Sequence, residues 1–346
     1  MSLMKSFTLA LGMAAALFAT GAQAAEPASC KAVRFADVGW TDIQVTTGVA
    51  QVLLEALGYS PEVTTLTVPV AYASLKNKDI DVFLGNWMPS MTTDIAPYTA
   101  DKSVETITAN LEGAGYGLVV PQYVADAGVK SLLDLGAHKD QFGGKIYGIE
   151  SGNDGNRIIG EMIADPANKL AGFELVESSE AGMLTEAEKA MKNNEWIIFL
   201  GWTPHPIMGE MKIHYLDGMG DTGFGAATVY TNVRAGYTGE CPNVGKLLTN
   251  LKFSLEMEGA MMEPVLKDGA DPKATALGWL KANPGAVTPW LEGVTTFDGG
   301  NAAEAVSAWT PSPISSRRGR CPSAAGARRS STSSSTISNG CSTPSS

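Results

Sequence analysis

The chain has 346 residues, 44% of them hydrophobic and 18% charged, which is long enough for two domains of ordinary size. Its formal net charge is −11. The two ends hold only Lys5 and five arginines, so residues 25–309 contain 19 basic and 36 acidic residues, a net charge of −17. This negative charge excludes a nucleic-acid-binding surface and suits a small cationic ligand, although solubility alone is the commoner reason for an acidic composition.

The first 24 residues are predicted to be a signal peptide. Lys5 supplies a positive start, residues 7–18 are almost wholly apolar, and Ala22–Ala24 is a small-residue cleavage site. The apolar run is too short for a transmembrane anchor. We therefore expect export, with cleavage after Ala24.

Cysteine usage agrees with an oxidising compartment. Cys30 and Cys241 are the only cysteines between residues 25 and 309. Exported proteins rarely keep free thiols, so we predict a disulfide between the two, with two free thiols as the alternative. Closing so long a loop should stabilise the fold by roughly 4–5 kcal/mol in the chain-entropy model.

The composition changes abruptly after Trp309. Of the 36 residues from Pro311 onward, 13 are serine and none is aromatic or acidic. Such a stretch cannot bury a core, so residues 310–346 are expected to be disordered. The abruptness favours a shifted reading frame over a functional basic tail.

Strands and helices alternate over the first segment after the leader. The predicted strands cover residues 33–38, 63–68 and 80–84, and the predicted helices cover residues 41–57 and 69–75. This order starts a parallel sheet. The third strand is expected to end at Gly85, so that Trp87 lies on the loop at its C-terminal end, where ligands bind in open α/β sheets.

A long extended segment, residues 106–123, is interrupted by three glycines and suits a strand that passes from one domain to another. Residues 228–237 are predicted to return to the first domain, and residues 243–309 to be mostly helical. A second α/β series is predicted between the crossings, with strands at 145–149, 173–176 and 196–200 and helices at 131–135, 154–164 and 185–193.

The predicted fold class is therefore α/β, with two α/β lobes joined by a two-segment hinge that permits closure over a ligand. Lobe 1 is discontinuous and comprises residues 25–112 and 227–309, while lobe 2 comprises residues 113–226. A single large α/β enzyme domain is the competing layout.

Four aromatic residues follow apolar strands or lie in the glycine-rich crossover: Trp40, Trp87, Tyr116 and Trp202. A glycine lies directly before, or one residue away from, three of them, and such small neighbours would let a ligand approach the ring face. Aromatic faces that converge in a cleft recognise quaternary ammonium groups, and each ring contributes about 0.5–2 kcal/mol. Core packing is the alternative for any one ring. The other tryptophans are assigned to packing: Trp196, Trp279, Trp290 and Trp309.

Two polar positions complete the expected site. Asp42 could meet the cation, although the helix dipole alone favours an acid in a first helical turn. The loop Ser151–Asn156 joins a strand to a helix, so Asn153 and the backbone N–H groups could bind the polar end of a ligand. An ordinary loop with helix-capping residues is the equal alternative there.

Signals for catalysis and for metal binding are poor. His138, His205 and His214 lack metal-ligand spacing, and the sequence contains no G-x-S-x-G motif. His205 is expected to be structural. We therefore expect a protein that is not an enzyme, with no catalytic residue, no metal and no cofactor.

Two motifs carry a family resemblance, Phe83–Pro89 (FLGNWMP) and Gly201–His205 (GWTPH). They resemble the motifs of the glycine betaine/choline substrate-binding proteins of ABC importers, and most of all those of the periplasmic choline-binding proteins of rhizobia. The resemblance covers about residues 30–309 and implies a type II periplasmic-binding-protein fold. It also implies that the four aromatic residues form a box, that Asp42 lies near the ammonium group and that Asn153 reaches the choline hydroxyl.

The predicted function is that of a periplasmic receptor that captures choline and delivers it to the membrane permease of an ABC importer. Asp42 favours choline, with acetylcholine tolerated, because an acid beside the cage repels the carboxylate of betaine. A glycine betaine or carnitine receptor is the close alternative, and an exported enzyme acting on quaternary amines is the alternative of a different class. We expect a monomer with no nucleic-acid partner.

Overall fold

The computed structural model describes residues 25–309. The predicted signal peptide, residues 1–24, and the predicted tail, residues 310–346, lie outside the described residues. Among the helices of residues 25–309, none combines the length and the apolar character that a membrane crossing requires.

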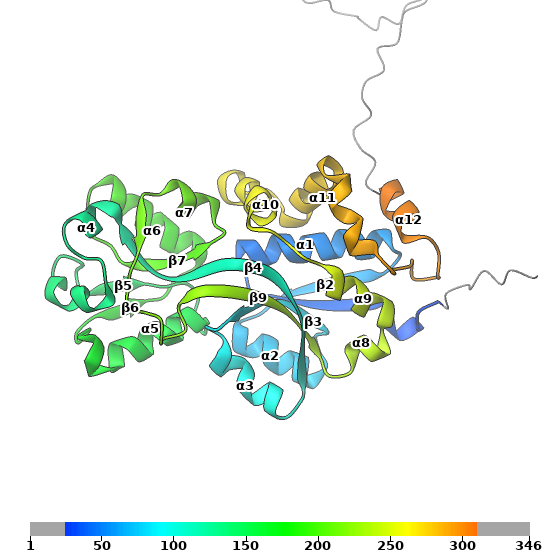
Figure 1. The fold of residues 1–346 in the computed structure, drawn as a ribbon, viewed down its shortest axis with the longest axis horizontal. Coiled ribbons are helices and arrows are strands. Elements are labelled where there is room, and N and C mark those ends of the chain that lie inside the picture. The colour runs from blue at the N-terminus through cyan, green and yellow to red at the C-terminus, as the bar shows by residue number, and fades with distance from the viewer. Residues whose placement is uncertain (1–24, 310–346) are drawn as a thin grey trace, which may run out of the picture. The chain divides into compact units, whose positions relative to one another are not determined.

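One mixed sheet organises the described residues (Figure 1). Its strands are β1 Ala32–Asp37, β2 Ser60–Thr65, β3 Val82–Met88, β4 Val104–Pro121, β5 Lys145–Tyr147, β6 Glu174–Val176, β7 Phe199–Thr203, β8 Ile213–Tyr215 and β9 Gly225–Arg234. Their order is β2-β1-β3-β9-β4-β7-β5-β6, with β8 paired to β4. The strands β1, β2 and β3 pair in parallel, as do β5, β6 and β7, while β4 and β9 are antiparallel to their neighbours.

The two parallel groups of strands form two α/β lobes, each with its own helices (Figure 1). The helices of the lobe around β1–β3 are α1 Thr41–Ala56, α2 Val68–Asn77, α3 Thr92–Ala100, α8 Tyr237–Glu240, α9 Pro242–Asn250, α10 Leu255–Asp268, α11 Pro272–Ala282 and α12 Ala302–Trp309. Those of the lobe around β5–β7 are α4 Gln122–Asp126, α5 Asp154–Ala164, α6 Glu180–Lys192 and α7 Pro206–Glu210. The predicted fold class is confirmed.

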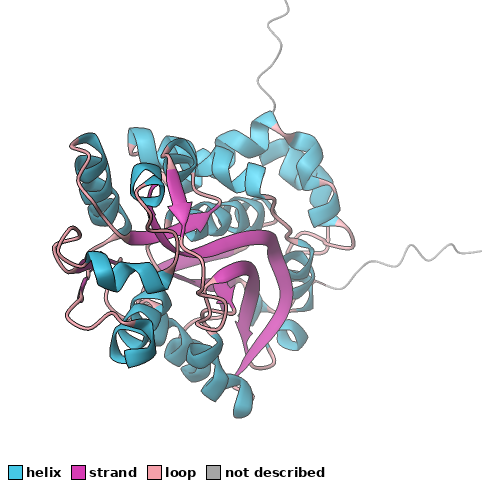
Figure 2. Cartoon of the chain, turned by 60° about the vertical axis from the view of Figure 1, so that its left-hand side comes forward, coloured by secondary structure: helices cyan, strands magenta, loops and turns pink. Residues whose placement is uncertain are grey.

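The strands β4 and β9 are shared by the two lobes. Residues 104–116 of β4 pair with β9, and residues 115–119 pair with β7 of the other lobe. Both strands curve as they pass through the sheet (Figure 2). The predicted lobe boundaries, at 112/113 and 226/227, fall inside these two strands and stay a prediction.

The strand β3 continues past its predicted end. Asn86, Trp87 and Met88 pair with β9 in the antiparallel direction, so Trp87 lies on a strand rather than on a loop. Pairing with β9 satisfies the backbone groups of these residues, and the sequence of β3 alone carries no sign of that partner.

Two further expectations are corrected. The helix α6 begins at Glu180, five residues before its predicted start, because the Ser179 side chain caps it by accepting a hydrogen bond from the Gly182 N–H. Trp309 is 48% exposed and therefore does not belong to the core, whereas Trp290 is buried.

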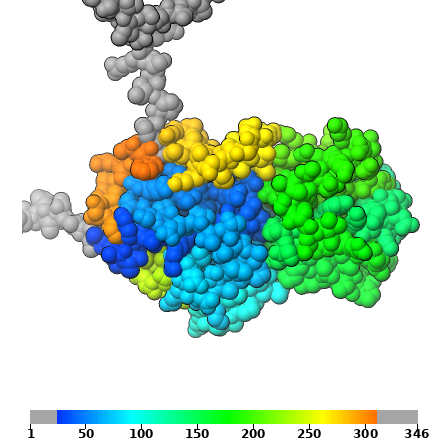
Figure 3. Space-filling model, turned by 180° about the vertical axis from the view of Figure 1, so that it is seen from behind, coloured from blue at the N-terminus to red at the C-terminus, as the bar shows by residue number. Residues whose placement is uncertain are grey.

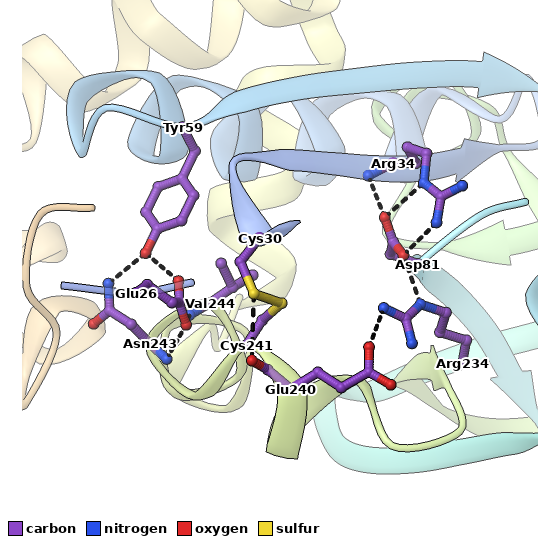
Figure 4. The surroundings of a disulfide bond; sticks show 10 residues. All are labelled: Glu26, Cys30, Arg34, Tyr59, Asp81, Arg234, Glu240, Cys241, Asn243 and Val244. Atoms are coloured by element: carbon purple, nitrogen blue, oxygen red, sulfur yellow. Dashed lines mark hydrogen bonds and ion pairs between the residues drawn. A yellow bond between two sulfur atoms is a disulfide. The ribbon is translucent and has the colours of Figure 1, made fainter. Parts of the chain in front are cut away.

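A disulfide joins Cys30, two residues before β1, to Cys241, the residue before α9, and confirms the predicted pairing (Figure 4). Beside it, the carboxylate of Glu26 accepts hydrogen bonds from the backbone N–H groups of Asn243 and Val244 at the start of α9. A carboxylate at a helix N-terminus is stabilised by the helix dipole. The first described residues are thus fastened to the C-terminal helices at two points.

A buried carboxylate ties three strands of the same lobe together. Asp81, directly before β3, accepts hydrogen bonds from Arg34 of β1 at 2.9 Å and from Arg234 of β9 at 2.7 Å (Figure 4). Burial by itself would raise the pKa of Asp81, but the hydrogen bonds from the two arginines outweigh burial and lower it. The ionised form of this carboxylate is therefore the stable one in the folded protein.

Replacing both Cys30 and Cys241 by alanine should lower the free energy of unfolding by roughly 4–5 kcal/mol, because their 211-residue separation would no longer constrain the unfolded chain. Urea unfolding of the mature protein, followed by tryptophan fluorescence, measures this loss. A thiol reductant should cause a similar loss in the wild type and none in the double variant, which is the control. An unchanged unfolding midpoint of the reduced wild type would contradict the prediction.

Candidate ligand-binding site

Residues from both lobes line one cavity, and the space between their atoms, part of it open to solvent, amounts to about 260 Å³. The lining residues are Trp40, Asp42, Trp87, Tyr116, Ile149, Asp154 and Trp202. Five of the six predicted ligand-binding residues are thus brought together from distant parts of the chain. Asn153 is the sixth and does not line the cavity.

Trp87 reaches the cavity from β3 and is only 3% exposed. Its indole Nε1 donates a hydrogen bond of 3.2 Å to Oδ2 of Asp42, which lies in the first turn of α1. The bond fixes the ring and leaves the other carboxylate oxygen, Oδ1, without a hydrogen-bond partner in the described part of the chain.

Tyr116 and Trp202 face one another across neighbouring strands. They are directly paired in the β4–β7 ladder, and their ring centroids are 6.5 Å apart in an edge-on arrangement. The Tyr116 ring also lies 5.8 Å from that of Trp87 and contacts Phe224, edge-on, at 5.1 Å. One phenol ring therefore links the aromatic residues that the two lobes supply.

Trp40 occupies the position directly before α1 and is held from the opposite lobe. Its Nε1 donates a 2.7 Å hydrogen bond to Oε1 of Glu150, which follows β5. The preceding residue, Gly39, has φ +85°, a conformation that side-chain-bearing residues rarely adopt. Gly39 thus lets the chain turn sharply from β1 into α1 and present the indole to the cavity.

The glycines next to the other rings serve packing rather than ligand access, which corrects the sequence interpretation. A Cβ atom at Gly85 would lie 2.8 Å from the Phe83 ring and 2.9 Å from Ile43. A Cβ atom at Gly201 would lie 2.6 Å from Val119. The space that these glycines leave is filled by the core.

Asn153 does not line the cavity but forms hydrogen bonds with residues that do. Its Oδ1 accepts hydrogen bonds from the Asn156 N–H, which caps α5, and from the Tyr116 hydroxyl at 3.2 Å. Its Nδ2 donates to Oδ1 of Asp154. The side chain is therefore engaged within the protein, and it is Asp154, the next residue, that reaches the cavity.

The two carboxylates of the cavity lie in an environment that disfavours negative charge. Asp42 and Asp154 are each 1% exposed, and each keeps one oxygen without a hydrogen-bond partner among the described residues. Burial, and after it the neighbouring Glu180 carboxylate, raises the pKa of Asp42 to about 7. Burial also raises the pKa of Asp154 to about 7. A cation in the cavity would favour the ionised form of both carboxylates and lower their pKa values again.

The cavity contains no basic counter-ion. None of the ion pairs within residues 25–309 involves Asp42, Asp154 or Glu150. The indole Nε1 of Trp202 is also buried without a partner there, so it can donate to an oxygen of a ligand. Burial raises the pKa of Tyr116 well above its usual range, which keeps its hydroxyl protonated.

No cluster of side chains suitable for a metal ion occurs in the described chain. The three histidines lie apart and have structural partners: the ring of His138 contacts Trp196, His205 contacts Glu180, and His214 contacts the backbone oxygen of Lys130.

Several residues around the cavity were missed by the sequence interpretation. Asp154 lies in the loop Ser151–Asn156, beside Asn153, and Glu150 directly precedes that loop. Asp154 is buried and Glu150 is half-buried, and nothing else distinguishes them from ordinary loop acids. Glu180 approaches Asp42 from the first turn of α6, far away in the sequence. Phe224 follows a glycine-rich stretch that carried no aromatic pattern, so nothing in the sequence pointed to it.

Two α/β lobes that share two strands and line one cavity between them define the type II periplasmic-binding-protein fold. The sequence profile of the substrate-binding domain of ABC-type glycine betaine transport systems (OpuAC) matches residues 31–282. The chain belongs to this family.

Known proteins resemble this chain over much of its length. The solved structure of an ABC-transporter choline-binding protein in complex with choline is 58% identical, with a TM-score of 0.80, and the match covers 82% of this chain and 99% of that one. An uncharacterized protein of Chromohalobacter salexigens is 61% identical over 129 residues, 37% of this chain and 83% of that protein. The glycine betaine/carnitine transport binding protein GbuC of Listeria monocytogenes is 32% identical over 177 residues, 51% of this chain and 57% of that protein.

Asp42→Asn should stabilise the empty protein relative to the wild type, increasingly so as the pH rises from 5 to 7. The pKa of Asp42 is raised to about 7, so its neutral form contributes stability that is lost as the pH rises through 7, whereas asparagine stays neutral. Relative to its value at pH 5, the difference in free energy of unfolding should grow by up to about 3 kcal/mol and level off above pH 7. Urea unfolding of the ligand-free proteins between pH 5 and pH 8 measures it.

Asp101→Asn is the control for this comparison. The hydrogen bond from Lys76 lowers the pKa of Asp101 to about 2, so this acid is ionised throughout the tested range. The difference in free energy of unfolding between this variant and the wild type should therefore stay constant between pH 5 and pH 8. A similarly constant difference for Asp42→Asn would show that Asp42 does not titrate in this range.

Proposed function

We propose that the protein is a receptor that binds choline in this cavity and delivers it to the membrane permease of an ABC importer. The observation that carries the proposal is the combination of four aromatic rings with two buried carboxylates that take part in no ion pair within the described chain. Aromatic faces attract a quaternary ammonium group, and the carboxylates offset its charge. The resemblance to a choline-bound binding protein over most of the chain supports the same ligand.

Each residue is given one role in this proposal. Trp40, Trp87, Tyr116 and Trp202 surround the trimethylammonium group, and Asp42 offsets its charge. Asn153 acts through the Tyr116 hydroxyl, which it holds at 3.2 Å, rather than by direct contact with the ligand. Asp154 accepts a hydrogen bond from the alcohol group through its free oxygen, and Trp202 donates one to it through its free Nε1.

Glycine betaine and carnitine fit this site less well. Both carry a carboxylate. Among the described side chains that line the cavity, the free donor is Nε1 of Trp202, and two carboxylates line the same cavity. Like charges brought together in a desolvated site discriminate strongly against such a ligand. The same argument leaves acetylcholine acceptable in charge, because its ester group is neutral.

The proposal extends to the biology of the protein. Residues 25–112 and 227–309 form lobe 1, residues 113–226 form lobe 2, and closure of the two lobes about β4 and β9 captures the ligand. The protein acts as a periplasmic monomer after cleavage behind Ala24, performs no chemistry on its ligand and needs no cofactor. Export agrees with the disulfide, since such bonds persist in oxidising compartments.

Calorimetric titration of the mature protein tests the proposal directly. Choline should bind with a dissociation constant in the micromolar range or below, about 8 kcal/mol of binding free energy, and glycine betaine much more weakly. Tight binding of betaine with weak binding of choline would reject the electrostatic argument. Conversion of choline into any product during the incubation would reject the receptor function in favour of the enzyme.

Trp87→Ala and Trp202→Ala should each weaken choline binding by roughly 2- to 30-fold while the protein stays folded, because each removes one face of the cage, which contributes about 0.5–2 kcal/mol. Trp309→Ala is the matched control: this tryptophan is 48% exposed and lies outside the cavity, so affinity should not change. Binding is measured by calorimetry and folding by circular dichroism. Unchanged affinity in both cavity variants would contradict the aromatic cage.

A further inference from the structure

Glu180 connects the lobe around β5–β7 to the lobe around β1–β3. It is the first residue of α6 and is 6% exposed. Its Oε2 accepts a 2.9 Å hydrogen bond from the backbone N–H of Thr41, the first residue of α1. That N–H is one of the unpaired donors at a helix N-terminus, so an anion from the other lobe suits it.

His205 holds Glu180 in place. Its Nδ1 accepts a hydrogen bond from the Met208 N–H at 3.2 Å, so in the neutral ring the proton resides on Nε2 and is donated to Oε1 of Glu180 at 3.1 Å. The His205 ring also contacts Trp202 edge-on, with centroids 4.8 Å apart. The position of Glu180 is therefore linked to a wall of the cavity.

Glu180 also places a negative charge near Asp42. Asp42 follows Thr41 directly, and the Glu180 carboxylate is the strongest influence on the pKa of Asp42 after burial. The lobes adjoin (Figure 3), so their contact brings together two carboxylates, one from each lobe. Two like charges in a desolvated region repel one another, and a cation beside them removes that repulsion.

We propose that Glu180 is a positioning residue that couples the charge of the ligand to the contact between the lobes. With a cation in the cavity, Glu180 can hold α1 through Thr41 without repulsion from Asp42. In the empty cavity the same contact is opposed by that repulsion whenever Asp42 is ionised. The inference rests on the proposed function, since it requires a cationic ligand.

Another contact between the lobes lacks this property. Arg157 of α5 donates to Asp94 at 2.9 Å and to the backbone oxygen of Ser90 at 2.7 Å. This contact joins opposite charges, so it favours the closed arrangement whether or not a ligand is present. The contact through Glu180 instead combines an attraction to the other lobe with a repulsion that a cation can remove.

Two variants and two ligands test the inference by calorimetry. The ligands are choline and its neutral analogue, the alcohol with a tert-butyl group in place of the trimethylammonium group. Glu180→Gln removes the charge. It should weaken the binding of choline on the order of tenfold and change the affinity for the neutral analogue by no more than about twofold. Glu180→Asp keeps the charge but shortens the side chain, so it should weaken both ligands and preserve their ratio.

The outcomes separate this inference from the proposed function. Equal weakening of both ligands in Glu180→Gln would give Glu180 a merely structural role and overturn the inference. A wild type that binds neither ligand, or that does not prefer choline, would instead contradict the proposed function. Thermal unfolding of each variant shows whether it is folded.

Hydrogen exchange of the wild type gives a second measurement that requires no variant. Choline should slow exchange of the Thr41 amide, because its acceptor, Glu180, is then held against it, and the neutral analogue at equal saturation should slow it much less. Equal protection by the two ligands would overturn the inference even if Glu180→Gln failed to fold.

Discussion

The site depends on a buried negative charge that the described chain does not neutralise. Asp42 and Asp154 each keep a free carboxylate oxygen, and neither takes part in an ion pair within residues 25–309. A buried charge without a partner is costly, and here the cost is expressed as pKa values raised to about 7. Asp81 shows the contrast in the same molecule: two arginines surround it, its pKa is lowered, and it serves structure alone.

The sheet is what brings the site together. The strand β4 is long enough to pair with β9 in one lobe and with β7 in the other, and Tyr116 lies where these two pairings meet. From there its ring contacts Trp87 of one lobe and Trp202 of the other. A change in the angle between the lobes therefore changes the cage itself, which is how such a fold can couple ligand binding to closure.

The alternation of strands and helices, the disulfide and the convergence of four aromatic rings could be predicted from the sequence, because each depends on local pattern or on a motif. Trp87 and Trp202 lie in recognisable motifs, and Asp42 lies close to Trp40. Glu180 and Phe224 could not be found in this way, because their importance comes from burial against residues more than 100 positions away. The glycine at position 85 was misread for the same reason: its neighbour in space is Ile43, not a ligand.

The magnitudes explain why the acids matter as much as the rings. Four aromatic faces at about 0.5–2 kcal/mol each supply between about 2 and 8 kcal/mol, and micromolar binding needs about 8 kcal/mol after the entropic cost of association. The cage alone therefore falls short of that affinity even at its upper limit. It also does not distinguish choline from betaine, which carry the same trimethylammonium group. Charge supplies the difference: the carboxylates that burial destabilises are stabilised by the cation and repel a ligand that carries its own carboxylate. The burial that destabilises the ionised carboxylates in the empty cavity thus also makes the cavity selective for choline over betaine.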